Sequence, residues 1–271
     1  MIYLICTPIG NLNDISLRSI EILNSSDLIY AEDTRNAKKI FQKFKIIKKS
    51  FSFNDHNERT KIRNIIEEAK AGKTISVISD AGAPLISDPG YLLVNECIKK
   101  NINFSVIPGP SSVINSLLLS GLKTNKFMFL GFLPRKDSER KKLFENNIKN
   151  DATLVFFESP KRLVKTLSVM NKIYPSSKQV VVCREMTKIH EEVIRGSISE
   201  ILEKMSLRDV KGEICLLVEG HQEKIGTTVD LNIEIKDLIL KSMPPTEAAK
   251  LLSIITKQSK RDLYDWLIKK A

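Results

Sequence analysis

The chain has 271 residues, enough for one large or two modest domains, and 42% hydrophobic and 28% charged residues are ordinary for a globular protein. No apolar run reaches membrane-spanning length, and the first residues lack the basic and then apolar layout of a signal peptide, so we expect a cytoplasmic protein without a membrane segment. The net charge of +11 favours an anionic partner such as nucleic acid, but only 11 of the 43 basic residues are arginine, and a genome biased toward A and T would also encode a lysine-rich chain.

Apolar segments of strand length alternate with amphipathic segments of helix length in the first part of the chain. The expected strands lie over 2–6, 27–31, 46–52, 74–79 and 103–107. The expected helices lie over 14–24, 34–44, 58–71 and 91–100, and an apolar helix follows Pro108–Ser112 as far as about Leu119. Asp14 or Ser16 would cap the first of these helices. Such an alternation predicts a mostly parallel sheet that is covered by helices.

The alternation continues with different spacing after a turn at 121–126, which we interpret as a domain boundary. Further strands are expected over 127–131, 153–157, 179–184, 190–195 and 212–218, with helices over 136–149, 160–172 and 197–206. The polar segment 220–230 is typical of a linker, and 231–271 has helical periodicity with helix starts at Pro244–Glu247 and Ser259–Asp262. We therefore expect α/β domains over 1–122 and 123–222 and a small helical C-terminal domain over 231–271.

Cysteines and histidines give no sign of a metal site. The four cysteines are far apart and form no CxxC pair, and the three histidines lack the spacing of metal ligands. We expect small buried thiols in a reducing compartment and no bound metal.

The segment Ser79–Gly90 is the most informative part of the sequence. Glycine, proline and aspartate crowd together there, at the point where the expected strand 74–79 gives way to a helix. These residues let the backbone approach a ligand closely and leave amide groups free to bind it. Because ligands of α/β proteins bind at the carboxyl ends of strands, the segment predicts a small-molecule site.

Two other turns of the first half could have the same role. Cys6–Asn11 follows the first strand but holds a single glycine, so the GxGxxG pattern of a dinucleotide site is absent. It is either a tight turn that lines a site or a purely structural one. Pro108–Ser112 places two hydroxyl groups at a helix N-terminus, where they would bind a ligand or only cap the helix.

Charged turns complete the set of candidate site segments. In the turn after the second expected strand, Asp33 or Thr34 would cap the next helix, whereas Glu32 and Arg35 would stand at the carboxyl edge of the sheet. In the second half, Phe157–Arg162 ends a strand in a polar turn. Cys183–Glu192 gathers ionisable and polar side chains between two strands, although a solvated hairpin would look similar.

Taken in chain order, these segments resemble the tetrapyrrole methylase superfamily of S-adenosylmethionine-dependent methyltransferases, and within it the ribosomal RNA small subunit methyltransferase I family. The matching motifs run from residue 2 to about 220, and eight ordered motifs are far more specific than a single glycine-rich loop. They are Thr7–Leu12, Ala31–Arg35, Ser79–Gly90, Ile107–Ser112, Gly131–Arg135, Phe157–Arg162, Arg184–Glu192 and Lys211–Glu213. The helical tail is also of the kind that the family carries.

The resemblance implies two α/β domains with the methyl donor, S-adenosyl-L-methionine, in the cleft between them, and a homodimer. It also implies methyl transfer to the 2′-hydroxyl of a cytidine, expected to be cytidine 1402, in the decoding region of 16S rRNA. The donor would be held mostly by the backbone of loops that follow sheet strands. Carried over to this sequence, the donor-binding residues are Pro8, Gly10, Asp80, Ala81, Gly82, Ala83, Pro84, Leu85, Ser111 and Ser112 from the first domain and Phe157, Glu158, Met186 and Glu213 from the second.

Transfer from an activated donor depends mainly on alignment of the two reactants, and a ribose hydroxyl benefits from a nearby base or from an acceptor that orients it. We expect the segments 32–35 and 184–192 to form the acceptor side and do not separate base from orienter. The candidate catalytic residues are Glu32, Arg35, Arg184, Glu185, Lys188 and His190, with Asp33 and Glu191 as further acids and Arg135 as a further phosphate contact.

Other interpretations stay open at this point. The tail is either an auxiliary RNA-contact domain or a small helical appendage, and its basic and aromatic residues include Lys250, Lys257, Lys260, Arg261 and Trp266. The chain could instead be a methyltransferase of the same superfamily that acts on a tetrapyrrole or on a modified protein residue. A non-enzymatic RNA-binding protein that keeps the loops only for shape is the alternative from a different class.

Overall fold

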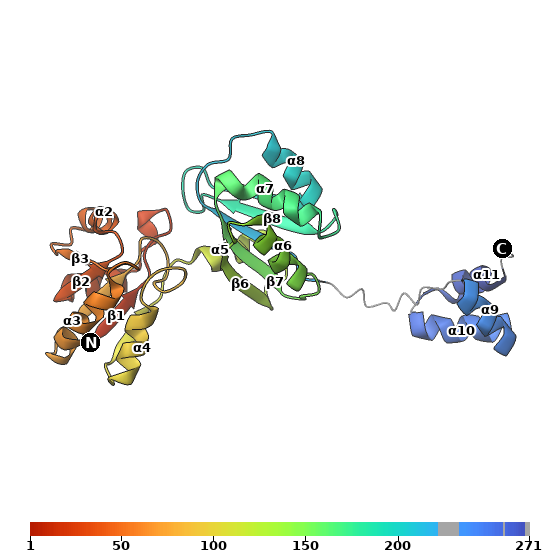
Figure 1. Ribbon diagram of the computed structural model, residues 1–271, viewed down its shortest axis with the longest axis horizontal. Helices are drawn as coiled ribbons and strands as arrows, with labels where there is room; N and C mark the ends of the chain where they lie inside the picture. The colour runs from red at the N-terminus through yellow and green to blue at the C-terminus, as the bar shows by residue number, and fades with distance from the viewer. Residues whose placement is uncertain (222–232, 257, 269–271) are drawn as a thin grey trace. The chain divides into compact units, whose positions relative to one another are not determined.

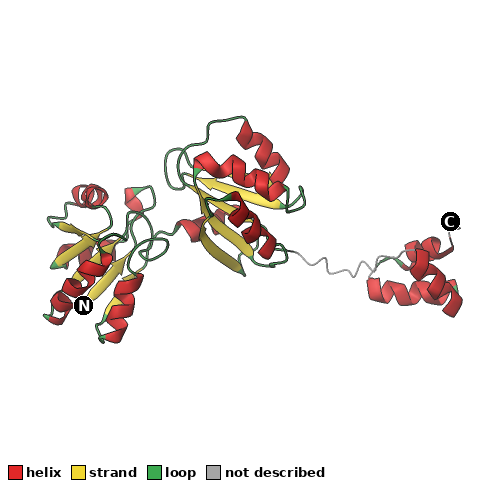
Figure 2. Ribbon diagram, in the orientation of Figure 1, coloured by secondary structure: helices red, strands yellow, loops and turns green. Residues whose placement is uncertain are grey.

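The computed structural model describes residues 1–221, 233–256 and 258–268 (Figure 1). These residues belong to two compact units, Met1–Gly220 and His221–Ala271. The first unit holds two five-stranded sheets with helices packed on them, and the second unit is helical (Figure 2). The α/β fold class expected from the sequence is confirmed.

The first sheet contains only parallel strands, in the order β3-β2-β4-β1-β5. Each strand except the last is followed by a helix or a long connection that returns the chain to the same end of the sheet, which is what a parallel arrangement requires. The strands are β1 (Ile2–Ile5), β2 (Leu28–Ala31), β3 (Ser50–Ser52), β4 (Ile75–Ile78) and β5 (Phe104–Ile107). The helices are α1 (Leu17–Ser25), α2 (Thr34–Phe44), α3 (Glu58–Lys70) and α4 (Tyr91–Lys99).

Successive residues of β1, which lies between β4 and β5, enter two different cores. Ile2 and Leu4 pack with residues of α3 and α4, whereas Ile5 packs with residues of α1 and α2. Burial on both faces explains why the strands of this sheet are nearly continuous apolar runs. Because the strands are parallel, the loops after their carboxyl ends all lie at one edge of the sheet.

Two expected elements of this half differ in length from their prediction. The helix expected from residue 14 begins at Leu17, because the Ser16 hydroxyl accepts a hydrogen bond of 3.1 Å from the Ser19 N–H and caps it, while Leu12–Asp14 forms the short 3₁₀ helix η1. The strand expected over 46–52 is reduced to β3. Lys45 adopts a left-handed φ of 55° that ends α2, and Ile46 then turns into the core.

The second sheet has the order β6-β7-β10-β8-β9, and only β6 and β7 are parallel. The mostly parallel arrangement that the alternation predicts therefore holds for the first sheet alone. The strands β8 and β9 are joined by a short loop without a helix, which permits only antiparallel pairing. The strands are β6 (Phe127–Phe132), β7 (Thr153–Glu158), β8 (Gln179–Arg184), β9 (Glu192–Ser197) and β10 (Ile214–Val218).

Helices cover both faces of this sheet. On one face, residues of α6 (Asp137–Asn146), α7 (Pro160–Asn171) and α8 (Ile198–Ser206) share a core with the strands. On the other face, Val113 and Leu117 of α5 (Ser112–Ser120) pack against residues of β7, β8 and β10. The helix that follows the first sheet thus covers the second one, and the domain boundary that we expect at 122 comes just after this helix and stays a prediction.

The second unit consists of α9 (Ile233–Ser242), α10 (Pro245–Thr256) and α11 (Lys260–Ile268). The helix starts expected at Pro244–Glu247 and Ser259–Asp262 are confirmed. Its small core joins α10 and α11 through Ala248, Ala249, Leu252, Leu263 and Leu267. Most of the expected linker 220–230, and the basic residue Lys257, lie outside the described residues. Within the described ranges, no helix combines the length and the apolar character needed to cross a membrane.

Candidate active site

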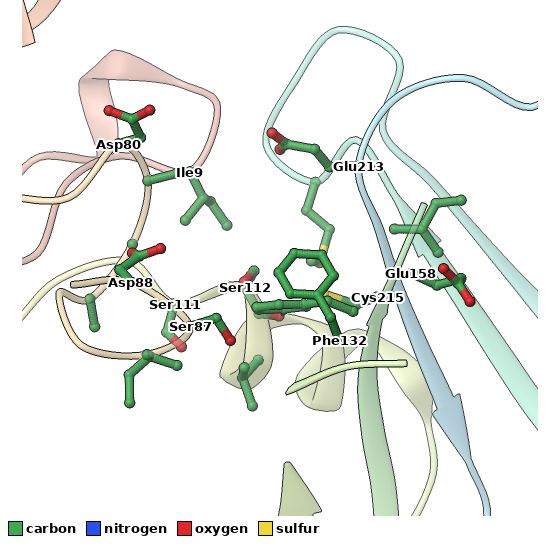
Figure 3. Close-up of a pocket in the computed structure, with 18 of the residues that line it drawn as sticks. Ile9, Asp80, Ser87, Asp88, Ser111, Ser112, Phe132, Glu158, Glu213 and Cys215 are labelled. Atoms are coloured by element: carbon green, nitrogen blue, oxygen red, sulfur yellow. The ribbon is translucent and has the colours of Figure 1, made fainter. Parts of the chain in front are cut away.

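The carboxyl edge of the first sheet opens onto a pocket of about 380 Å³ (Figure 3). The loops after β1, β2, β4 and β5 form one side of it, and segments of the second sheet form the other. The first side contributes Ile9, Glu32, Asp80, Ala81, Gly82, Ala83, Ile86, Ser87, Asp88, Ser111, Ser112 and Val113. The second contributes Phe132, Phe157, Glu158, Ser159, Pro160, Met186, Gly212, Glu213, Ile214 and Cys215.

The loop 79–90 is fixed to the β1 loop by backbone pairing. The Thr7 N–H donates to the Gly82 carbonyl at 2.8 Å, the Gly82 N–H donates back at 3.0 Å, and the buried Thr7 hydroxyl donates to the Ser79 carbonyl at 3.1 Å. At its far end the Gly90 N–H donates to the carboxylate of Glu58 in α3. Leu85 and Ser87 have positive φ angles of 72° and 69°, and such strain in non-glycine residues concentrates at ligand sites.

Asp80 joins this loop to the start of α2. Its carboxylate accepts hydrogen bonds from the Asp33 N–H and the Asn36 amide, both at 3.0 Å. Its own N–H donates to the Glu32 carboxylate at 3.2 Å. The side chain and the N–H of Asp80 are therefore both engaged in holding two pocket loops together.

Besides Asp80, two carboxyl groups that line the pocket, Glu32 and Asp88, have no ion-pair partner among the described residues. Burial raises the pKa of Asp88 to about 7, and the negative charges of Glu32, Asp80 and Asp55 act in the same direction, against a hydrogen bond from Ser79. Burial also raises the pKa of Glu32. None of the residues that line the pocket is basic, and within the described part of the chain neither carboxyl forms an ion pair. A cationic ligand would relieve this excess of negative charge.

The third loop brings the N-terminus of α5 to the pocket. Ser111 is its N-cap, with the side-chain oxygen accepting from the Ile114 N–H, and Ser112 occupies the first helical position. Unpaired amide groups and the helix dipole favour an anionic group at such a terminus. The pocket thus offers carboxylates on two loops and an anion-binding helix end on a third.

Glu158, at the end of β7, has the most extensive set of partners in the second wall. Its oxygens accept from the Ser159 N–H at 2.7 Å and the Thr166 hydroxyl at 2.6 Å, and Arg162 forms an ion pair with it. Behind it lies Arg140, which is 1% exposed, donates to Thr166 and stands 3.9 Å from the carboxylate. Unlike Glu32, Glu158 is neutralised from within the protein, so the pocket wall at this point carries no net excess of charge.

The expected catalytic residues other than Glu32 lie outside the lining of the pocket. Arg35 is 88% exposed and pairs with Asp33, whose pKa its hydrogen bonds hold at about 2. Arg184 donates to Glu192 and to the Lys211 carbonyl. His190 is exposed in the loop between β8 and β9.

Glu185 and Lys188 are bound to each other at 2.8 Å, and Lys188 also reaches Glu213 at 3.0 Å. The hydrogen bond from Lys188 lowers the pKa of Glu185. The charges of Glu185 and Lys188 are therefore neutralised by neighbouring side chains. Their ion pair supports the pocket wall that Glu213 and Met186 form.

Ten of the fourteen expected donor-binding residues line the pocket, and Pro8, Gly10, Pro84 and Leu85 lie outside its lining. Gly10 has a packing role, since a Cβ there would lie 2.6 Å from Lys188 Cγ and 2.8 Å from the Met186 carbonyl oxygen. Next to it the Asn11 N–H donates to the Thr187 hydroxyl at 3.0 Å. These contacts fasten the β1 loop to the second wall.

The sequence interpretation did not select several lining residues, Asp88 and Phe132 among them. Both lie inside segments that it singled out, so their position in the turn was the available signal. The burial of Asp88 beside Glu32 depends on loops from two strands and carries no local signature. Among the described residues, no group of histidine, cysteine and carboxylate side chains could hold a metal ion, and burial raises the pKa of the pocket thiol Cys215 to about 12.

Comparison with known proteins shows the family to which this chain belongs. Residues 1–202 match the family model of the Tetrapyrrole (Corrin/Porphyrin) Methylases. Solved structures share the fold: a diphthine synthase with a TM-score of 0.65 at 16% identity, covering 80% of this chain and 89% of that one, and the uroporphyrin-III-C-methyltransferase of Thermus thermophilus with a TM-score of 0.55 at 17% identity, covering 80% and 93%. The chain belongs to the tetrapyrrole methylases, a family of methyltransferases.

Curated relatives narrow the assignment. Proteins named ribosomal RNA small subunit methyltransferase I are 40% identical in Halalkalibacterium halodurans, over 97% of this chain and 93% of the relative, and 40% identical in Rickettsia prowazekii, over 99% and 96%. The relative from Thermotoga maritima is 42% identical, and 96% of its length corresponds to only 80% of this chain. Within the tetrapyrrole methylases, the chain belongs to the ribosomal RNA small subunit methyltransferase I family, as its motifs predict.

Proposed function

We propose that this chain transfers the methyl group of S-adenosyl-L-methionine to the 2′-hydroxyl of a cytidine in the decoding region of 16S rRNA, on the small ribosomal subunit. The observation that carries the proposal is the pocket at the carboxyl edge of the first sheet, which combines apolar walls with carboxyl groups that have no ion-pair partner among the described residues. The names of the relatives support ribosomal RNA as the substrate.

The pocket residues fit this donor, which is a cation at its sulfonium and ammonium groups and also carries an adenine ring and a carboxylate. Glu32 and Asp88 match its positive charges, and the N-terminus of α5 at Ser112 matches its carboxylate. Ile9, Met186 and Ile214, each less than 8% exposed, supply apolar surface for the ring. When bound, the donor supplies a methyl group that is already activated for displacement.

The acceptor hydroxyl must lose a proton, and two carboxyl groups of the pocket can take it. A general base is most effective when its pKa lies near the working pH. Asp88, with a pKa of about 7, fits this requirement, and we propose that its carboxylate oxygens accept the proton. Glu32, one loop away, would keep Asp88 poised through its negative charge.

The proposal includes a homodimer. Ile114 and Leu118 lie four residues apart on α5 and so share one face of this helix, where they are 44% and 74% exposed. Apolar surface of this kind is typical of contacts between subunits. Sedimentation analysis should give a dimer mass for the wild type and a shift toward monomer for Leu118→Lys, whereas a monomeric wild type would contradict the dimer.

The function is tested with purified protein, labelled S-adenosyl-L-methionine and small subunits that lack the modification. We expect label in 16S rRNA only, at a ribose 2′-oxygen of one cytidine. Label that enters a tetrapyrrole or a protein residue and never rRNA would refute the proposal in favour of another activity of the superfamily. Absence of donor binding in calorimetry would instead favour a non-enzymatic RNA-binding protein.

A further inference from the structure

Phe132 is an unusually accessible aromatic residue for the lining of a pocket. Its side chain is 62% exposed, whereas the pocket residues Ile9, Met186, Ile214 and Cys215 are each less than 8% exposed. Figure 3 shows the ring between the side that carries Ser87 and Asp88 and the side that carries Cys215. The ring therefore stands at the entrance and leaves the deeper apolar surface to a smaller ligand.

A backbone irregularity aims this ring at the pocket. The pairing of β6 with β7 shifts register between Phe129 and Phe132, and Gly131 within this bulge has a φ of 67°. Bulges redirect side chains next to functional sites, and a positive φ is readily adopted only by glycine. In a regular strand, Phe129 and Phe132 would point to opposite faces of the sheet, yet here both rings contact the same neighbour.

That neighbour, Phe157 on β7, fixes the orientation of the ring. The centroids of Phe132 and Phe157 are 5.2 Å apart in an edge-to-face arrangement, and Phe129 meets Phe157 at 4.8 Å in the same way. The tilted contact supports Phe132 from one side, and its exposure of 62% leaves the rest of the ring open to a ligand. A rigid, exposed ring is a suitable surface for stacking.

Three residues after Phe132, Arg135 adds a positive charge to the same segment. Arg135 is exposed and forms no ion pair within the described part of the chain. Proteins that bind single-stranded RNA combine aromatic side chains, on which bases stack, with cations that contact the phosphates. The motif Gly131–Arg135 provides both within five residues.

We propose that Phe132 is the platform on which a nucleobase of the single-stranded RNA at the acceptor nucleotide stacks, with Arg135 contacting the adjacent phosphate. This inference rests on the proposed function and adds to it the residue that seats the acceptor at the entrance. The donor, which is smaller, uses the buried lining behind it.

The test compares full-length Phe132→Ala, Phe132→Trp and Phe132→Leu with the wild type. Phe127→Ala is the matched control, because Phe127 begins the same strand, is 42% exposed and lies outside the pocket lining. Three quantities are measured: the affinity for unmodified small subunits without donor, the affinity for S-adenosyl-L-methionine alone, and the melting temperature.

We expect Phe132→Ala and Phe132→Leu to weaken binding of small subunits by about 10- to 100-fold, the range of a lost base stack, while Phe132→Trp stays within about threefold of the wild type. Donor affinity and melting temperature should not change, and Phe127→Ala should behave as the wild type. Small-subunit binding that is unchanged in Phe132→Ala would overturn the inference. A loss of donor affinity in parallel would also overturn it, since the ring would then belong to the donor site. A wild type that methylates no small subunits would refute the proposed function and this inference together.

Discussion

Replacement of Asp88 by asparagine tests the electrostatics of the pocket. In the folded protein the pKa of Asp88 is about 7, against an ordinary value of 3.8, because the carboxyl is buried and faces the charges of Glu32, Asp80 and Asp55. The folded state therefore binds a proton more tightly than the unfolded state does. Asp88 does not lower the free energy of unfolding below pH 3.8. Between pH 3.8 and about 7 it lowers this free energy progressively, and above that by a constant amount. Asparagine keeps the shape of the group and cannot ionise.

The size of the effect follows from the difference between the two pKa values. For a fully buried carboxyl, a shift of this size would lower the free energy of unfolding by about 4 kcal/mol above pH 7, at about 1.4 kcal/mol for each unit of pKa difference. Asp88 is partly open to solvent, which screens its charge, so we expect about 1–2 kcal/mol. In a unit of this size, that is a rise in melting temperature of about 2–8 °C for Asp88→Asn at pH 8.

Thermal unfolding between pH 5 and pH 8.5 measures this directly. The advantage of Asp88→Asn over the wild type should grow with pH and level off above pH 7, while Asp14→Asn, at an exposed site outside the pocket lining, should show no such trend. Saturating S-adenosyl-L-methionine should stabilise the wild type more than the variant, because the cation neutralises the ionised carboxyl. An advantage that is independent of pH would refute the account of Asp88 as a buried carboxyl among like charges.

Three further measurements test the role of Asp88 in the reaction and the packing around the pocket. If Asp88 accepts the proton, kcat/KM of the wild type should rise with pH about a midpoint near 7, because kcat/KM reports the ligand-free enzyme. In Asp88→Asn, kcat/KM should lack that dependence and kcat should be at least tenfold lower, as steady-state kinetics on small subunits would show. Gly10→Ala should force the β1 loop away from Lys188 and the Met186 carbonyl. This should lower the free energy of unfolding by about 1–3 kcal/mol and weaken donor binding in calorimetry. Melting curves equal to those of the wild type would contradict the close contact. Arg140→Met should remove the buried cation behind Glu158 and leave its ion pair with Arg162. The variant should therefore be destabilised in denaturant unfolding, by less than the about 3–5 kcal/mol that a wholly unpaired buried charge costs, and Glu158→Gln in the same chain should recover part of the loss.

The helical unit can be tested by truncation after Gly220. Met1–Gly220 forms a compact unit of its own, and the Thermotoga maritima relative corresponds to only 80% of this chain. The truncated protein should bind S-adenosyl-L-methionine with unchanged affinity in calorimetry. If the tail is an RNA-contact domain, truncation should raise KM for small subunits and reduce the salt dependence of binding. An unchanged KM would support a small helical appendage instead.

The loops that form the first side of the pocket are predictable from the sequence because their determinants are local. An apolar run that ends in Ser79–Gly90, with glycine, proline and aspartate, defines both a strand end and a loop able to approach a ligand. The charged segment 184–192 was harder to interpret, because a sequence does not reveal which charges neutralise one another. The structure pairs Lys188 with Glu185 and Glu213, and Arg184 with Glu192. The burial of Arg140 was equally invisible, since an arginine in a charged helix is typical of a solvated face.

The distribution of charge separates the two ligands that the proposed reaction needs. The net charge of +11 belongs to the chain as a whole, yet none of the residues that line the pocket is basic. Three of its carboxyl groups, Glu32, Asp80 and Asp88, lack an ion-pair partner among the described residues. A polyanion such as RNA is attracted to the protein but repelled from the interior of this pocket, whereas a cationic donor is stabilised there. Only a nucleotide that leaves its phosphates at the rim could present a neutral ribose hydroxyl to Asp88. This is why an exposed cation and an aromatic ring at the entrance, Arg135 and Phe132, suit the acceptor better than basic residues inside the pocket would.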